Sequence, residues 1–225
     1  MPIGDVQPGD AILADKPVEV SRYRGFTRIN HWVTAISLLA LAISGLALFH
    51  PSFFALTGLF GGGQSTRMLH PWFGVVLLIS FFVLFAQLWR ANLWRREDSA
   101  WVAHSKDVLE HHEDKLPEIG KYNAGQKVAF WSMAALIVVL FATGLVSWQH
   151  YFGASTSIEM QRVAILVHAA ASIGMVLVVI VHVYAAFWTR GTIRAMTRGT
   201  VTGGWAWRHH RKWLRALARD HRAGA

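Results

Sequence analysis

Four histidines lie inside apolar parts of this 225-residue chain, and their chemistry needs an explanation first. An ionisable or metal-ligating side chain is costly in the hydrocarbon layer of a membrane, so each is a candidate functional residue with a partner. The four are His31, His70, His168 and His182. Two histidines that face each other in an apolar helix bundle would supply the axial ligands of a b-type haem.

These histidines lie in four apolar segments, each close to the length of about 20 residues that a helix needs to cross a bilayer. No charged residue falls within any of the segments. Because backbone polar groups in lipid must be satisfied within the segment, we predict an all-α membrane protein with a four-helix transmembrane bundle. The predicted spans cover about residues 29–49, 68–88, 128–148 and 163–188.

Basic residues are distributed unequally around these spans. Of the 22 Lys and Arg residues, all but Arg67 and Arg162 lie before the first span, between the second and third, or after the fourth. The positive-inside rule therefore predicts a multi-pass membrane protein whose two termini and middle loop are cytoplasmic. The net charge of +9 follows from this topology, so we predict no nucleic-acid partner.

The chain contains no cysteine. This excludes a disulfide, an iron–sulfur cluster of its own and a haem attached through thioether bonds. The N-terminus carries acids and prolines but no basic segment before an apolar stretch, so we predict a cytoplasmic arm and not a cleaved signal peptide. The predicted division is an arm (1–28), a transmembrane dihaem domain (29–189) and a basic cytoplasmic tail (190–225), with a short interfacial helix before Pro117.

The directions of the four helices place the histidines at two depths. His31 and His182 are predicted near the cytoplasmic face, and His70 and His168 near the outer face. The fourteen residues from His168 to His182 make nearly an integral number of turns and rise about 21 Å, so both rings face the bundle interior. We therefore predict an inner haem held by His31 and His182 and an outer haem held by His70 and His168, which together would carry electrons across the bilayer.

Histidines within a membrane can also serve sites without haem. Zinc or a di-metal centre would need carboxylates or clustered ligands, and the spans contain no Asp or Glu. A haem-free transporter or scaffold with four spans is an alternative, although transporters usually place acids in the membrane. The remaining histidines are predicted to be solvated: His50, His104, His111, His112, His150, His209, His210 and His221.

Two arginines each precede a predicted ligand by three residues and therefore share a helix face with it: Arg28 before His31, and Arg67 before His70. A haem carries two propionates, and a guanidinium group suits a carboxylate, so we predict that both arginines bind propionates. The positive-inside bias explains Arg28 equally well. Gly45 would leave room for the outer haem, although close helix packing also accounts for a small residue there.

Five motifs surround these residues: RINHW at His31, MLHPWFG at His70, KYNAGQK at 121–127, VHAAASI at His168 and VHVYAAFW at His182. Together they resemble the cytochrome b556, or gamma, subunit of respiratory formate dehydrogenase over about residues 21–215. The histidine pattern alone is shared with cytochrome b subunits of hydrogenases and thiosulfate reductases. About twenty N-terminal residues precede the matching region.

The resemblance implies that this chain never touches formate. A molybdenum- or tungsten-pterin (alpha) subunit would oxidise formate outside the membrane, and an iron–sulfur (beta) subunit would pass electrons to the outer haem. The inner haem would then reduce menaquinone or ubiquinone near the cytoplasmic face of the bacterial inner membrane, where the resemblance places the chain. A free-standing dihaem cytochrome b561, for example a superoxide oxidase that reduces quinone without partner subunits, is an alternative.

The loop before the third span enters it at the depth of the inner haem. Reduction of quinone needs donors close to the quinone oxygens, and amide groups and a cation in this loop can serve. An ordinary turn and helix cap would explain the same residues, but similarity to the family favours Asn123 first. The predicted quinone contacts are Asn123, Gly125, Gln126, Lys127 and His182.

Overall fold

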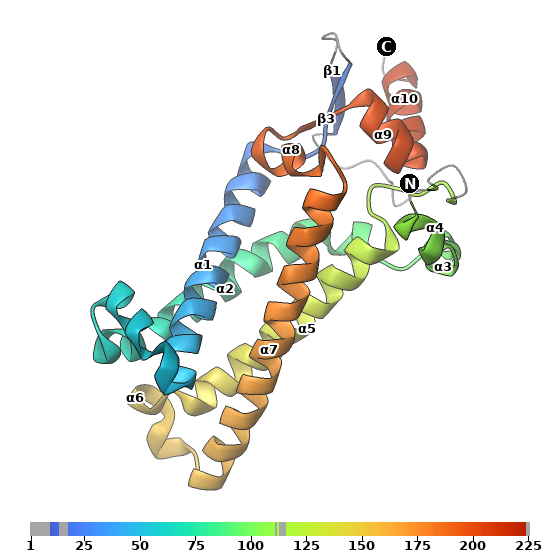
Figure 1. Cartoon of the computed structure of the whole chain (residues 1–225). Coiled ribbons are helices and arrows are strands. Elements are labelled where there is room, and N and C mark those ends of the chain that lie inside the picture. The colour runs from blue at the N-terminus through green and yellow to red at the C-terminus, as the bar shows by residue number, and fades with distance from the viewer. Residues whose placement is uncertain (1–9, 14–17, 111, 113–115, 224–225) are drawn as a thin grey trace. The chain divides into compact units, whose positions relative to one another are not determined.

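The computed structural model describes residues 10–13, 18–110, 112 and 116–223. Within these residues, four helices are long and apolar enough to cross a membrane. The prediction of an all-α chain with four spans is therefore confirmed. These helices are α1 (Gly25–Phe49), α2 (Gly63–Leu88), α5 (Ala124–Ser147) and α7 (Ile158–Trp188) (Figure 1).

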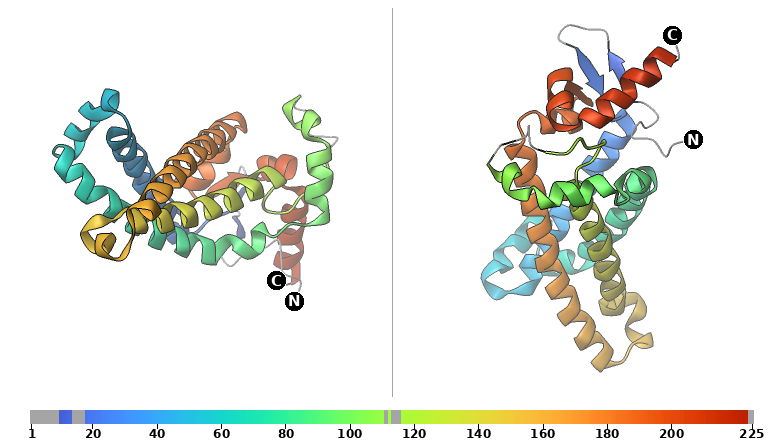
Figure 2. Two further views of the ribbon diagram at one scale, coloured as in Figure 1. Left: turned by 90° about the horizontal axis from the view of Figure 1, so that it is seen from below. Right: turned by 90° about the vertical axis from the view of Figure 1, so that its right-hand side faces the viewer.

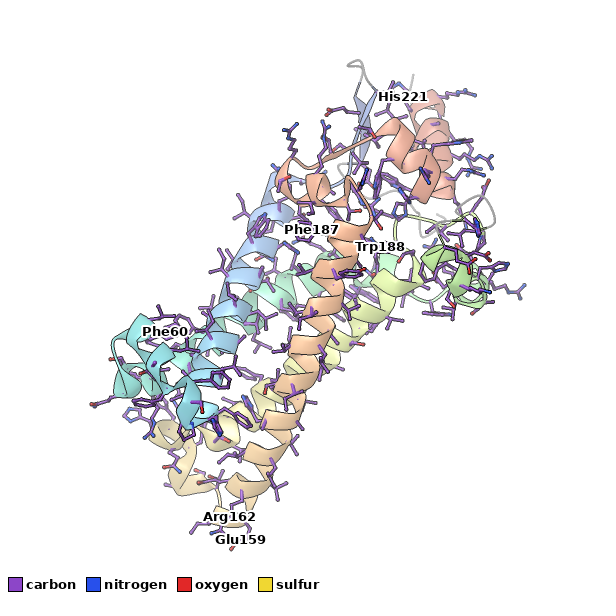
Figure 3. The ribbon with its side chains drawn as sticks, in the orientation of Figure 1. Phe60, Glu159, Arg162, Phe187, Trp188 and His221 are labelled. Carbon is purple, nitrogen blue, oxygen red and sulfur yellow. The ribbon has the colours of Figure 1, made fainter. Side chains whose placement is uncertain are left out.

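Each long helix begins four or five residues before the predicted span. The predicted spans were limited to the uncharged apolar segments, so they left out the more polar first turn of each helix. A helix continues past the hydrocarbon layer while its backbone hydrogen bonds are kept. In α7, Glu159 and Arg162 lie in the added first turns, and Phe187 and Trp188 lie at the other end of the helix (Figure 3). Aromatic residues at a helix end suit a membrane interface.

Short helices connect the long ones. The 3-10 helix η1 (Pro51–Phe60) joins α1 to α2, and α6 (Gln149–Phe152) with η4 (Gly153–Ser155) follows α5. The segment after α2 forms η2 (Trp89–Asn92), α3 (Arg96–Ala103) and α4 (Ser105–Leu109). The prediction of a short helix before Pro117 is thus confirmed.

A small sheet that the sequence patterns did not predict joins the two ends of the chain. Strands β1 (Ala11–Leu13), β2 (Glu19–Ser21) and β3 (Thr200–Thr202) pair antiparallel in the order β1-β2-β3. Three-residue strands are too short to show a clear alternating pattern. The last helices are α8 (Thr192–Thr197), α9 (Gly203–His209) and α10 (Arg211–Ala223), and β1 contacts α10 (Figure 2).

The chain divides into two compact units. The terminal unit contains residues 1–28, 86–131 and 182–225, and the central unit contains residues 29–85 and 132–181. The core of the central unit is built by three long helices through Leu77, Ile137 and Met175, with Leu41 of α1 packed against it.

The core of the terminal unit lies between the sheet and the C-terminal helices, where Val20, Val201 and Trp213 are almost completely buried. Gly199, just before β3, contacts the N-terminal segment after β2. Its φ is 85°, and its carbonyl accepts hydrogen bonds from the backbone N–H groups of Arg22 and Tyr23 at 2.8 and 3.1 Å. A Cβ atom at residue 199 would lie 2.7 Å from the Tyr23 carbonyl oxygen, so only glycine fits there.

Candidate haem and quinone sites

His70 of α2 and His168 of α7 face each other in the central unit. Their ring centroids are 6.3 Å apart, and the ring planes make an angle of 66°. A metal ion between two imidazole nitrogens, bonded to each at about 2 Å, would place the ring centroids about 6 Å apart. The spacing of the two rings therefore fits ligation of one haem iron from both sides.

A hydroxyl group on a neighbouring helix contacts each of these rings. Ser44 Oγ on α1 lies 2.7 Å from His70 Nδ1, and Thr143 Oγ1 on α5 lies 2.9 Å from His168 Nδ1. Each hydroxyl donates its proton to the carbonyl four residues earlier, at 2.6 and 2.7 Å respectively. The hydroxyl oxygens must then accept from an Nδ1–H group, and this tautomer leaves Nε2 of both rings free to ligate a metal.

A glycine follows each hydroxyl residue and gives its histidine ring room. A Cβ atom at Gly45 would lie 3.4 Å from His70 Cε1, and one at Gly144 would lie 3.5 Å from His168 Cε1. A Cβ atom alone would make ordinary contact at these positions, whereas a side chain that extends beyond Cβ toward the rings would crowd them. The expectation that Gly45 lies beside the outer site agrees with this geometry, whereas Gly144 was missed.

The two hydroxyl residues were not predicted from the sequence either. The signal that could have found them is a dipeptide, Ser44-Gly45 in α1 and Thr143-Gly144 in α5, repeated near the same ends of their helices. Each of the four long helices thus contributes to this one candidate site.

Arg67 lies one turn before His70 and is exposed. It lines a cleft of about 360 Å³ in the central unit, together with His50 and apolar side chains of α1 and η1. A guanidinium group that lines a cleft and lies one helical turn before His70 can bind a haem propionate. The assignment of Arg67 to that role stays a prediction with this geometry in its favour.

The second predicted histidine pair divides between the two units. His31 of α1 belongs to the central unit, where its ring meets Trp32 edge-on at 5.7 Å, and His182 of α7 belongs to the terminal unit. Their pairing stays a prediction. Arg28 donates from Nη1 to the Thr197 carbonyl at the end of α8 at 2.7 Å, so part of its guanidinium group already has a partner.

Asn123 and Gln126 form a reciprocal cap at the start of α5. The Asn123 side-chain oxygen accepts from the Gln126 backbone N–H at 2.8 Å, and the Gln126 side-chain oxygen accepts from the Asn123 backbone N–H at 3.0 Å. This arrangement satisfies two amides at the helix terminus. Because both side-chain oxygens are used, the two NH₂ groups are what these residues can offer to a quinone.

Lys127 has a different environment from the one predicted. Its ammonium group is buried and donates to Asp98 Oδ2 at 2.6 Å and to the Leu93 carbonyl at 3.1 Å. Lys127 therefore holds α5 against the segment around α3, and we do not retain it as a direct quinone contact. Asp98, which also accepts from the Arg95 backbone N–H at 2.6 Å, was missed because its partner lies 29 residues away.

Gly125 is exposed and lies next to an aromatic ring. A Cβ atom at this glycine would be 3.5 Å from the Trp101 ring and 3.5 Å from the Asn123 side-chain oxygen, which is ordinary contact. The indole of Trp101 on α3 thus lies beside the predicted quinone donors, a position that the sequence did not predict. A flat aromatic ring there can pack against a quinone head group.

The prediction of solvated histidines is wrong for His210, whose side chain is 1% exposed. Its Nδ1 donates to the Gly120 carbonyl at 2.7 Å. Burial, and secondarily the guanidinium group of Arg22, lowers the pKa of His210 well below its usual range. His111 lies outside the described residues, and His221 is exposed in α10 (Figure 3).

Four apolar helices that bring two histidines to metal-ligating distance define the class of membrane cytochromes b. Residues 22–199 match the prokaryotic cytochrome b561 family, so the chain belongs to that family. The haem-free alternative finds no support in this membership.

Particular relatives refine this assignment. The chain is 39% identical to the cytochrome b556(fdo) subunit of formate dehydrogenase from Escherichia coli over 198 residues, which are 88% of this chain and 93% of that protein. It is 36% identical over 88% of its length to the nitrate-inducible b556(Fdn) subunit from the same organism, of which 91% is covered. The b556 subunit from Haemophilus influenzae is 36% identical over 87% of this chain and 82% of that protein.

Proposed function

We propose that this chain is the membrane-anchoring dihaem cytochrome b subunit of a formate dehydrogenase complex and that it passes electrons to quinone. The observation that carries the proposal is the His70–His168 pair, whose spacing and Nδ1 partners suit one haem. The relatives that match along nearly their whole length are named as subunits of that enzyme, which favours it over a free-standing cytochrome.

Two haems are assigned to the two histidine pairs. His70 and His168 would hold the outer haem, and His31 and His182 the inner one. A b-type haem, when bound, supplies a one-electron carrier. Residues of this chain would hold it in place: Ser44 and Thr143 would fix the orientation and tautomer of the outer ligands, and Arg67 would offer a cation to a propionate.

The proposed orientation follows from the basic residues that flank the spans, with both termini and the α2–α5 connection in the cytoplasm. The His70–His168 pair then lies toward the outer face, where an iron–sulfur subunit would deliver electrons from a molybdenum- or tungsten-pterin subunit. Formate oxidation to carbon dioxide releases two electrons and one proton. One quinone takes up two electrons and two protons, so the complex supplies electrons in the required number.

The proposed quinone site is at the start of α5. The NH₂ groups of Asn123 and Gln126 would donate to a quinone oxygen and orient the head group, with the Trp101 ring beside it. Amide donors stabilise the negative charge that develops on that oxygen until protons arrive from the cytoplasmic side. His182 would add a ring N–H if its other nitrogen ligates iron.

Replacing Asn123 with aspartate separates its two roles. An aspartate keeps the oxygen that caps α5 but loses the NH₂ donor, so the helix should remain stable while quinone binding weakens. We expect both haems to stay bound and to be reduced by formate, and reoxidation by quinone to slow about tenfold or more, the effect of losing one good hydrogen bond. Stopped-flow spectroscopy of reduced haem in membranes that contain the complex measures this.

Two further variants serve as controls. Asn123→Ala should slow reoxidation to a similar degree and in addition destabilise the helix start, by about 1 kcal/mol. His182→Ala should instead lose the inner haem, so it fails at an earlier step. Reoxidation at the normal rate in both Asn123 variants, with unchanged inhibitor sensitivity, would place the quinone site elsewhere.

A further inference from the structure

The N-terminal arm is part of the folded terminal unit. We use "arm" for the described residues 10–13 and 18–23, which include β1 and β2. β2 pairs with β3, and β1 packs against α10 (Figure 2). Most of the arm and both C-terminal helices lie outside residues 22–199, the part that matches the cytochrome b561 family. Membership of the family therefore does not explain what these segments do.

Asp10 makes a buried ion pair with Lys121. The Lys121 ammonium donates to Asp10 Oδ1 at 2.5 Å, and both side chains are 2% exposed. Trp213 of α10 donates from its indole N–H to the other oxygen of Asp10 at 3.1 Å. Burial of two charges costs free energy, so a buried ion pair adds little net stability. The pair is therefore better explained by the position in which it holds the arm and the loop than by a gain in stability.

Arg22 makes a second contact between the arm and the same loop. Its guanidinium group is buried, donates to the Lys121 carbonyl, and lies over the rings of Trp205 and Trp213 at 5.1 and 5.0 Å. The Lys121 ammonium in turn donates to the Arg22 carbonyl at 2.9 Å. The arm thus makes hydrogen bonds with both the side chain and the backbone of residue 121.

The loop held in this way leads directly to the proposed quinone donors. His210 fixes the Gly120 carbonyl, the arm fixes Lys121, and Tyr122 is buried. Asn123 comes next and caps α5. The chain therefore has little freedom between the last residue held by the arm and the amide that would meet the quinone.

We propose that the N-terminal arm positions the quinone site, with Asp10 acting through Lys121 as the positioning residue. This inference rests on the proposed function, because it assigns the arm to the quinone donors at Asn123. Asp10 and Lys121 do not touch the quinone. They determine where the Asn123 amide lies, and so how tightly the quinone binds.

The charge state of Lys121 makes the proposal testable by pH. Burial lowers the pKa of Lys121 to about 8, and Asp10 opposes this shift. The Arg22 guanidinium also lowers this pKa, the rings of Tyr23 and Trp213 lie 5.1 and 5.8 Å from the ammonium, and the buried His210 interacts electrostatically with it. The ion pair is therefore intact below pH 8 and is lost as the pH rises above it.

The test compares Asp10→Asn with wild type in membranes that hold the whole complex, with formate as donor and decylubiquinone or a soluble naphthoquinone as acceptor. We expect unchanged haem content and unchanged reduction by formate. The KM for quinone should rise about fivefold or more while kcat stays within about twofold. In wild type the KM should rise as the pH rises above about 8, whereas in Asp10→Asn it should already be raised below pH 8 and should change little across that range, because the ion pair is absent at every pH.

Two variants guard against a merely structural effect. Glu19→Gln removes another acid of the arm, whose partner is Arg194 of α8 and not the loop, and should leave the KM for quinone unchanged. The double variant Asp10→Asn/Lys121→Met removes both members of the buried ion pair, so neither charge is left without its partner, and it serves as the test variant if Asp10→Asn loses haem. Its KM should be raised and should no longer depend on pH near 8.

A wild-type KM and pH profile in Asp10→Asn, alongside a raised KM in Asn123→Asp, would overturn the role of the arm and leave the proposed quinone site standing. If Glu19→Gln raised the KM as much as Asp10→Asn, the assignment of Asp10 as the positioning residue would be overturned. A normal KM in both Asp10→Asn and Asn123→Asp would overturn the proposed quinone site and the role of the arm with it.

Discussion

His168→Ala should remove one of the two haems and block electron transfer from formate to the haem that remains. The substitution deletes one of two imidazoles whose ring centroids are 6.3 Å apart, and a single remaining histidine cannot hold the iron from both sides. The measurements are haem per protein, which should fall to about half, and the reduced-minus-oxidised spectrum after formate addition. His70→Ala should behave in the same way.

Thr143→Val is the matched control for this experiment. Valine has nearly the shape of threonine but cannot accept a hydrogen bond from the His168 Nδ1–H group. The variant therefore removes this hydrogen bond and keeps the imidazole that would ligate the iron. Loss of the hydrogen bond to a ligating histidine costs about 10- to 100-fold in affinity for a bound metal. The haem should therefore be retained but bound less tightly. Two full haems in His168→Ala would show that this histidine is not a ligand.

Lys127→Met should cause a large loss of stability. The variant leaves the Asp98 carboxylate, which is completely buried, without its cation. Removal of one partner of a buried ion pair costs about 3–5 kcal/mol. Thermal release of haem from the purified complex, followed by absorbance, should therefore occur at a clearly lower temperature than in wild type.

Lys106→Met provides the comparison. Lys106 pairs with Glu110 at 3.7 Å on the surface, where its side chain is 86% exposed. A pair of this kind contributes about 0.3–0.5 kcal/mol, so its loss should barely change haem release. If Lys127→Met were as stable as Lys106→Met, the Lys127–Asp98 pair would not join α3 to α5 in the way described.

The sequence predicted the four spans and the pairing of His70 with His168 because both depend on strong, local signals. An uninterrupted apolar segment needs no distant contact to be recognised, and a histidine inside it stands out by its cost. The spacing of His70 and His168 from their helix ends was enough to place them at one depth. The rings were then found facing each other.

What the sequence could not predict depends on contacts between distant residues. Asp10 and Lys121 are 111 residues apart, and nothing in either neighbourhood shows that they meet. His210 looked like one of several solvated histidines, yet it is buried by segments that are remote in the chain. The strands of the arm are three residues long and gain their stability from β3 and α10, so no local pattern marks them.

The central claim is that this chain binds two b haems as part of a formate dehydrogenase complex. The most direct test is to purify the tagged chain from its native membrane and record haem content, the reduced-minus-oxidised spectrum and the co-purifying subunits on one sample. We expect two low-spin b haems per chain, reduced on addition of formate, with an iron–sulfur subunit and a pterin-containing subunit present. A chain that carries one haem or none, or that isolates alone with full quinone reductase activity, would contradict this account.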